Sequence, residues 1–136
     1  MKKEIPLPDN HNRSLSSSLY LIEKLLCEME KAILGQDDSC CSETIKDIDN
    51  AAIADDLAAI KEARTYICIM VEKYNTSKKS QRLQRIIDAK RTKIWEILND
   101  SMSKKLKGYG TFPLKYAKEY DTDIAKLIEI TNKINF

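Results

Sequence analysis

The 136-residue sequence predicts an all-α protein, folded as an antiparallel up-down-up-down four-helix bundle. Glycine and proline number only 3 each, whereas average usage of the two together is about 12% and an all-β chain needs many turns built from them. Apolar residues recur at spacings of three and four along four long stretches, as in amphipathic helices. Short connections between the stretches make consecutive helices antiparallel neighbours.

The composition favours one folded domain covering residues 1–136. Apolar residues make up 43% of the chain, charged residues 32%, and the net charge is +2, which is not the balance of a disordered chain. A chain of this length buries roughly two-thirds of its unfolded surface, enough for a core without metal or disulfide support. Residues 1–11 contain Pro6 and Pro8 and are expected to form an extended lead-in.

The first helix is predicted over residues 12–34. Gly35 follows it directly, where a left-handed residue closes many helices. The residues that define its inward stripe are Leu15, Leu19, Ile22, Leu26, Met29 and Ile33.

A second helix is predicted over residues 43–75, after a polar loop at 35–42. Its start has two interpretations: Ile45 and Ile48 extend the apolar stripe back to residue 43, or the segment Asp47–Asn50 provides a later cap. We favour the earlier start. The stripe itself comprises Ile53, Leu57, Ile60, Arg64, Ile67, Val71 and Tyr74.

Arg64 is the one charged residue on that stripe. A helix of 3.6 residues per turn drifts against a 3.5-residue repeat, so Arg64 can lie at the edge of the bundle with its stem buried. Alternatively, it is a cation held inside the bundle, paired with a carboxylate or an anionic ligand.

A third helix is predicted over residues 80–107, closed by Gly108, and a fourth over residues 112–134. Thr111 can cap the fourth helix, and Pro113 is tolerated only in its first turn. The aromatic residues between and just after these boundaries resemble a binding loop, but their positions favour a hydrophobic plug over the end of the bundle. The plug would comprise Tyr109, Phe112 and Tyr116, and Tyr109 and Phe112 are the candidate bundle-end contact for a partner.

The sequence offers no catalytic constellation, so we expect a protein that is not an enzyme and that has no cofactor. The only histidine, His11, precedes the first predicted helix, which excludes the Glu-x-x-His ligands of di-iron bundles. The four cysteines lack the paired spacing of a zinc site, and we expect no metal. They are interpreted as reduced, half-buried apolar side chains: Cys27, Cys40, Cys41 and Cys68.

No stretch has the apolar length of a signal peptide or a transmembrane helix. We therefore expect a cytoplasmic protein without a membrane partner.

Charge is distributed unevenly along the chain. Residues 37–76 hold nine acidic and four basic side chains, whereas residues 78–107 hold ten basic and three acidic ones. These charges either flank the seam between the second and third helices and select its antiparallel pairing, or form a face for phosphates or an acidic partner. The candidate face comprises Lys78, Lys79, Arg82, Arg85, Lys90 and Lys93.

Two functions follow as hypotheses. The first is a non-catalytic interaction or assembly protein that self-associates or docks a helical partner, because the apolar faces are regular and broad. The second is an accessory nucleic-acid-binding protein that uses the basic face of the third helix.

Overall fold

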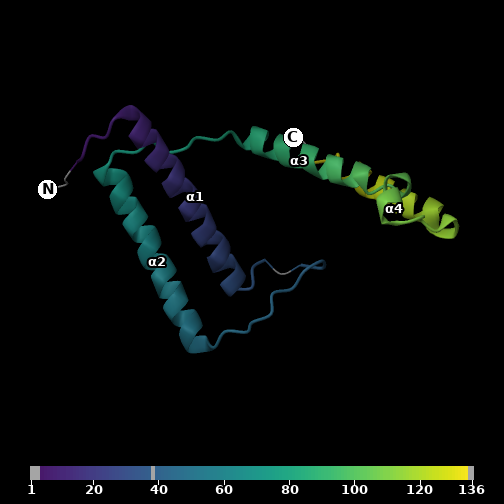
Figure 1. The fold of residues 1–136 in the computed structure, drawn as a ribbon, viewed down its shortest axis with the longest axis horizontal. Helices are drawn as coiled ribbons and strands as arrows, with labels where there is room; N and C mark the ends of the chain where they lie inside the picture. Colours follow the sequence, from purple (N-terminus) through teal and green to yellow (C-terminus); the bar gives the residue numbers. More distant parts are fainter. Residues whose placement is uncertain (1–3, 38, 135–136) are drawn as a thin grey trace. The chain divides into compact units, whose positions relative to one another are not determined.

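The computed structural model describes residues 4–37 and 39–134 and contains four α-helices with no strand among these residues. The chain divides into two compact units, Met1–Lys79 and Ser80–Phe136. The first unit contains α1 (Asp9–Ile33) and α2 (Asn50–Lys73), and the second contains α3 (Leu83–Asp100) and α4 (Leu114–Thr131). Within each unit the two helices pack together (Figure 1).

These findings confirm the all-α class and the four helices for the described residues, and the antiparallel pairing of consecutive helices inside each unit. A single domain over residues 1–136 stays a prediction. The expectation for residues 1–3 of the lead-in lies outside the described residues.

Helix α1 begins at Asp9, three residues before the predicted start. Pro8 is extended and occupies the N-cap, and its carbonyl accepts the first helical hydrogen bond from the amide of Asn12 at 2.9 Å. Proline is suited to this place because it has no N–H to leave unpaired. Asp9 adds a carboxylate to the first turn, where the helix dipole favours negative charge. His11 consequently lies within the helix and not before it.

The end of α1 matches the prediction for Gly35, which has φ of +71°. The amide of Gly35 donates to the carbonyl of Ala32, and the amide of Gln36 donates to the carbonyl of Lys31 at 2.8 Å. This is the Schellman arrangement, which satisfies the last carbonyls of the helix and favours glycine at the left-handed position.

Helix α2 begins at Asn50, so the favoured start at residue 43 is wrong and the later cap is correct. The Asp49 carboxylate accepts a hydrogen bond from the amide of Ala52 at 2.8 Å. Such a cap satisfies an amide that has no partner within the helix. Ile45 and Ile48 are exposed on the loop, so the apolar spacing there reflects no packed face.

The lead-in and the start of α1 both form hydrogen bonds with the end of α2. Asn75 adopts φ of +49° and closes the helix as Gly35 closes α1. The amide of Ile5 donates to the Lys73 carbonyl at 2.8 Å, and the Asn12 side chain donates to the Tyr74 carbonyl at 2.9 Å. The start of α1 therefore lies at the end of α2, which makes the pair antiparallel.

Helix α3 ends at Asp100, seven residues before the predicted end. The reason is a tertiary interaction with α4. The Asp121 carboxylate accepts hydrogen bonds from the Ser103 amide at 2.8 Å and from the Ser103 hydroxyl at 2.6 Å, and the Tyr120 hydroxyl donates to the Ser101 carbonyl. These groups would otherwise continue the helix.

Two short 3₁₀ turns, Ser103–Lys105 and Lys107–Tyr109, replace the missing end of α3. Gly108 is not left-handed, contrary to the prediction, and the residue with positive φ is Gly110, at +111°. Helix α4 starts at Leu114 with Pro113 as its N-cap, so Thr111 does not cap it.

The buried apolar core is small. Among the described residues only four hydrophobic side chains are buried, namely Leu19 on α1, Ile60 and Ile67 on α2, and Leu98 on α3. Most of the apolar side chains therefore remain accessible within the two helical pairs.

Candidate interaction surfaces

One face of the α1–α2 pair carries exposed apolar side chains from both helices. Arg64 of α2 lies beside Glu30 of α1, and Asn12 of α1 bonds to the Tyr74 carbonyl at the end of α2, which together give the antiparallel register of the two helices. Continuing that register brings six side chains level in three successive pairs, which we call the apolar patch: Ile22 with Met70, Leu25 with Tyr66, and Met29 with Ala63.

The apolar patch lies on one side of the pair. At 3.6 residues per turn, Leu25 lies about 120° round α1 from the buried Leu19, and Tyr66 lies about 120° round α2 from the buried Ile60, with the same sense of rotation. In an antiparallel pair, equal rotations of the same sense point to the same face. Leu25 is 55% exposed and Tyr66 is 59% exposed, so neither α1 nor α2 covers this face of the pair.

The opposite side of the same pair is charged and hollowed. A pocket of about 480 Å³ lies between α1, α2 and the segment that follows α2. The ammonium of Lys79 lies 4.4 Å from the centre of the Tyr20 ring at its rim, a cation–π contact. The residues that line it include Leu19, Tyr20, Glu23, Cys68, Glu72, Lys78 and Lys79.

Arg64 also lies on this charged side, where its guanidinium is 3.3 Å from the Glu30 carboxylate. The two side chains are 41% and 37% exposed. Arg64 therefore pairs with a carboxylate of α1, as expected if it were a paired cation. The pair lies at the edge of the two helices, as expected if Arg64 were an edge residue with a buried stem. A half-exposed pair of this kind contributes about 1 kcal/mol or less.

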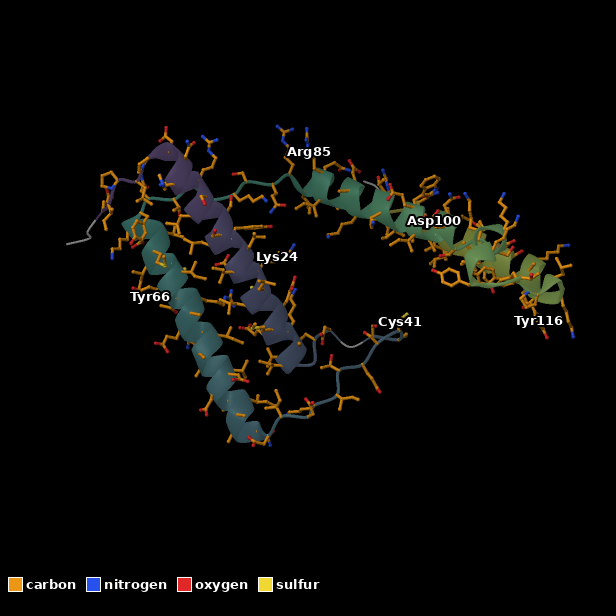
Figure 2. All side chains as sticks on the ribbon, in the orientation of Figure 1. Lys24, Cys41, Tyr66, Arg85, Asp100 and Tyr116 are labelled. Carbon is orange, nitrogen blue, oxygen red and sulfur yellow. The ribbon has the colours of Figure 1, made fainter. Side chains whose placement is uncertain are left out.

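The six predicted basic residues are all exposed. Lys78 and Lys79 follow α2 and belong to the first unit, whereas Arg82 precedes α3 and the other three lie on α3 (Figure 2 labels Arg85). Lys90 and Lys93 are within one turn of each other, but Arg85 is about 140° round the helix from Lys90. The basic residues of α3 are therefore spread over its outer half and do not form one narrow stripe.

The predicted plug of three aromatic residues does not form. The ring of Phe112 packs against that of Tyr120, with centroids 4.7 Å apart. Tyr109 is 92% exposed and Tyr116 is also exposed, so neither covers the end of a core. Tyr109 is left with its ring open to solvent beside three lysines of the same segment, Lys104, Lys105 and Lys107.

The carboxyl group of Asp121 on α4 has a clearly displaced pKa. The hydroxyl and the amide of Ser103 both donate to its carboxylate, and with the nearby charge of Lys104 they hold the pKa of Asp121 below its usual range. The carboxylate fastens the segment after α3 to α4 and is a structural group.

Removing the Ser103 hydroxyl should raise the pKa of Asp121, because that hydrogen bond is the largest cause of the lowered value. Since the folded pKa is the lower one, the contribution to stability is complete above the unfolded value of about 3.9 and is lost as the pH falls through the folded value. A carboxyl titration by NMR on the protein and on Ser103→Ala measures the change in pKa, and urea unfolding of both at several pH values measures the change in stability. Ser101→Ala removes a neighbouring hydroxyl that bonds to the Ile97 carbonyl instead, and it should leave the titration unchanged.

The cysteines differ from the prediction. All four are free, but only Cys27 is half-buried, while the other three are exposed. Cys40 and Cys41 lie on the loop between α1 and α2 (Figure 2 labels Cys41). Across residues 4–37 and 39–134, no three His, Cys, Asp or Glu side chains gather in a way that could hold a metal ion.

No helix in the part of the chain that the structure describes has the length and apolarity needed to span a membrane. Comparison of the chain with protein-family models, with curated proteins and with solved structures gave no match in any of the three.

Sequence reasoning assigned Ile22 and Met29 to the interior, but both are about half exposed. The signal that identifies their actual surface is a second stripe at helical spacing beside the first. On α1 this stripe comprises Ser18, Ile22, Leu25, Met29 and Ala32, and on α2 it comprises Ala59, Ala63, Tyr66 and Met70.

Proposed function

We propose that the chain is a non-catalytic interaction module that docks helices on the apolar patch of the α1–α2 pair. The observation that carries this proposal is the exposure of Leu25 and Tyr66 on one face, together with the uncharged stripes that surround them. A helix pair that needs only its own partner has a narrow apolar seam, whereas a wider apolar face is typical of helices that pack against further helices.

The test is whether the apolar patch is an accessible binding surface. The fluorescent dye ANS binds exposed apolar surface; it is added to the protein after dilution to the concentration at which light scattering shows single chains. We expect Leu25→Glu and Tyr66→Glu each to reduce the dye signal measurably, although other exposed apolar side chains of the chain also bind the dye. Ile45→Glu is the matched control, because Ile45 is 76% exposed on the loop outside the patch. A dye signal that ignores both patch substitutions contradicts the proposal.

A second candidate function is binding of nucleic acid or another polyanion through the basic side chains. Its support is the exposure of Arg82, Arg85, Lys90 and Lys93, none of which makes an ion pair among the described residues. Binding to duplex DNA at low salt should fall with a log–log slope of about −0.9 per phosphate contact. Replacing all four with glutamate should abolish it, whereas Lys24→Glu on α1 should not; absence of binding at low salt rejects this candidate.

A further inference from the structure

We infer that single-stranded nucleic acid binds to residues 101–118, the connection between α3 and α4 together with the first turns of α4, which we call the basic segment. The inference is independent of the apolar patch, and it uses none of the residues of the second candidate function. The basic segment holds five lysines and no acidic residue, whereas Asp100 precedes it and Glu119 follows it. All of these lysines are exposed, namely Lys104, Lys105, Lys107, Lys115 and Lys118.

The positive charge of the basic segment is not neutralised within the part of the chain that the structure describes. No ion pair joins any of its lysines to a described carboxylate. Lys104 lies near Asp121, but that carboxylate already accepts two hydrogen bonds from Ser103. Like charges gathered without carboxylates between them produce a positive potential that attracts a polyanion. The phosphates of a nucleic acid carry the complementary charge.

The basic segment also presents aromatic rings. Tyr109 is 92% exposed, so a planar group can lie against its ring. Three of the lysines share two short 3₁₀ turns with it, Ser103–Lys105 and Lys107–Tyr109. At about 2.0 Å per residue, the backbone from residue 104 to residue 109 spans about 10 Å, so the ring and the lysines can contact neighbouring nucleotides. A second exposed ring, that of Tyr116, lies 5.5 Å from the ammonium of Lys115 (Figure 2 labels Tyr116).

Contacts with α4 hold the basic segment in place. The Asp121 carboxylate accepts hydrogen bonds from the amide and the hydroxyl of Ser103. The Tyr120 hydroxyl donates to the Ser101 carbonyl, and its ring lies 4.7 Å from that of Phe112. A segment that is already held in one conformation loses less conformational entropy on binding.

The exposed aromatic rings favour a single strand over other polyanions. The bases of a single strand are free to stack on a side chain, whereas the bases of a duplex are stacked on one another. An acidic peptide brings negative charge but has no base to stack. A lipid surface also carries phosphate, but binding to it grows with the apolar area that is inserted, and Leu114 is the only exposed aliphatic side chain of the basic segment.

Fluorescence anisotropy of the full chain with a labelled oligothymidylate of about 20 nucleotides tests the inference. We expect binding at low salt that is tighter than binding to a duplex of the same length, because a surface that acts by charge alone would prefer the higher phosphate density of the duplex. Tyr109→Ala should weaken binding by at least about five-fold through the loss of one stacked base. Tyr109→Phe is the matched control, and it should bind like the unaltered protein because it keeps the ring.

The salt dependence of the same binding tests the lysines. Replacing Lys105 and Lys107 together with glutamine should reduce the log–log slope by about 1.4 in magnitude, because each phosphate contact with a single strand contributes about 0.7. Replacing Lys90 and Lys93 together with glutamine is the matched control on α3, outside the basic segment, and it should leave the slope unchanged. Circular dichroism checks that each variant keeps its helices, which is expected because all of these positions are exposed.

Absence of binding at low salt overturns the inference, and so does a duplex that binds as tightly as the single strand. Polyglutamate or phosphatidylserine vesicles that bind as well as the oligothymidylate would assign the surface to an acidic protein or a lipid, and would also overturn it. If only the Lys90 and Lys93 replacement changes the slope, the polyanion binds the α3 face, so the second candidate function stands and this inference fails. The dye experiment on the apolar patch is decided separately, because it concerns other residues.

Discussion

Replacing Ile67 with alanine is expected to destabilise the α1–α2 pair by about 2–3 kcal/mol. Ile67 is 8% exposed and is one of three buried apolar residues among the described residues of that unit. Its loss removes buried methyl and methylene groups and leaves a cavity that the neighbouring helix cannot fill completely. We place the effect at the lower end of the range for such substitutions because two helices can move together more freely than a closed core can. Urea unfolding followed by circular dichroism measures the change.

Ile69→Ala is the matched control for this experiment. Ile69 lies on the same helix, two residues away, and is half exposed. It should cost less than about 1 kcal/mol because it leaves no cavity. Equal effects at the two positions would show that Ile67 is not part of a packed seam. Fluorescence of Trp95, the single tryptophan, shows in the same samples whether the α3–α4 pair unfolds together with α1 and α2, which tests the prediction of a single domain.

Leu98→Ala is expected to destabilise the α3–α4 pair by about 2–3 kcal/mol. Leu98 is the one buried apolar residue among the described residues of that unit, at 8% exposed. It lies just before the end of α3, where Ser103 bonds to Asp121. Trp95 is one turn earlier on α3, so its fluorescence reports directly on this pair during urea unfolding. The midpoint should move to lower urea with little change in slope, as expected when stability changes and the unfolded state does not.

Ile97→Ala provides the control for Leu98→Ala. The two positions are adjacent on α3, but Ile97 is 55% exposed. Its substitution should lower the free energy of unfolding by less than about 1 kcal/mol. If Ile97 proved the more sensitive position, the side of α3 that packs against α4 would have to be reassigned.

The apolar spacing of the sequence predicted each of the four helices, because that spacing is a local property of the chain. The helix ends were less predictable where the deciding contact is distant. Gly35 closes α1 as expected, since a left-handed glycine acts on the turn just before it. The end of α3 depends instead on Asp121, eighteen residues further on. Its carboxylate takes the amide and hydroxyl of Ser103 out of the helix, and no spacing rule shows that contact.

Two local signals gave different starts for α2, namely the apolar stripe through Ile45 and Ile48 and the helix cap at Asp49. The apolar stripe continues through Ile45 and Ile48, but apolar spacing stabilises a helix only where the face is covered. Both residues are exposed, and the Asp49 cap is the stronger signal. The cap was visible in the sequence as one of two alternatives, and only the packing could choose between them.

The candidate surfaces show the same division. The sequence by itself determined the helical class, the apolar stripes and the uneven charge, because composition and periodicity act along the chain. The tertiary structure decided which apolar stripe of each helix is covered by the neighbouring helix of the same pair. It thereby left Ile22, Leu25 and Met29 on the same side as Tyr66, since the antiparallel register of α1 and α2 sets which side chains share a face. A helix with two apolar stripes does not reveal which one its neighbour covers, and that choice places the apolar patch.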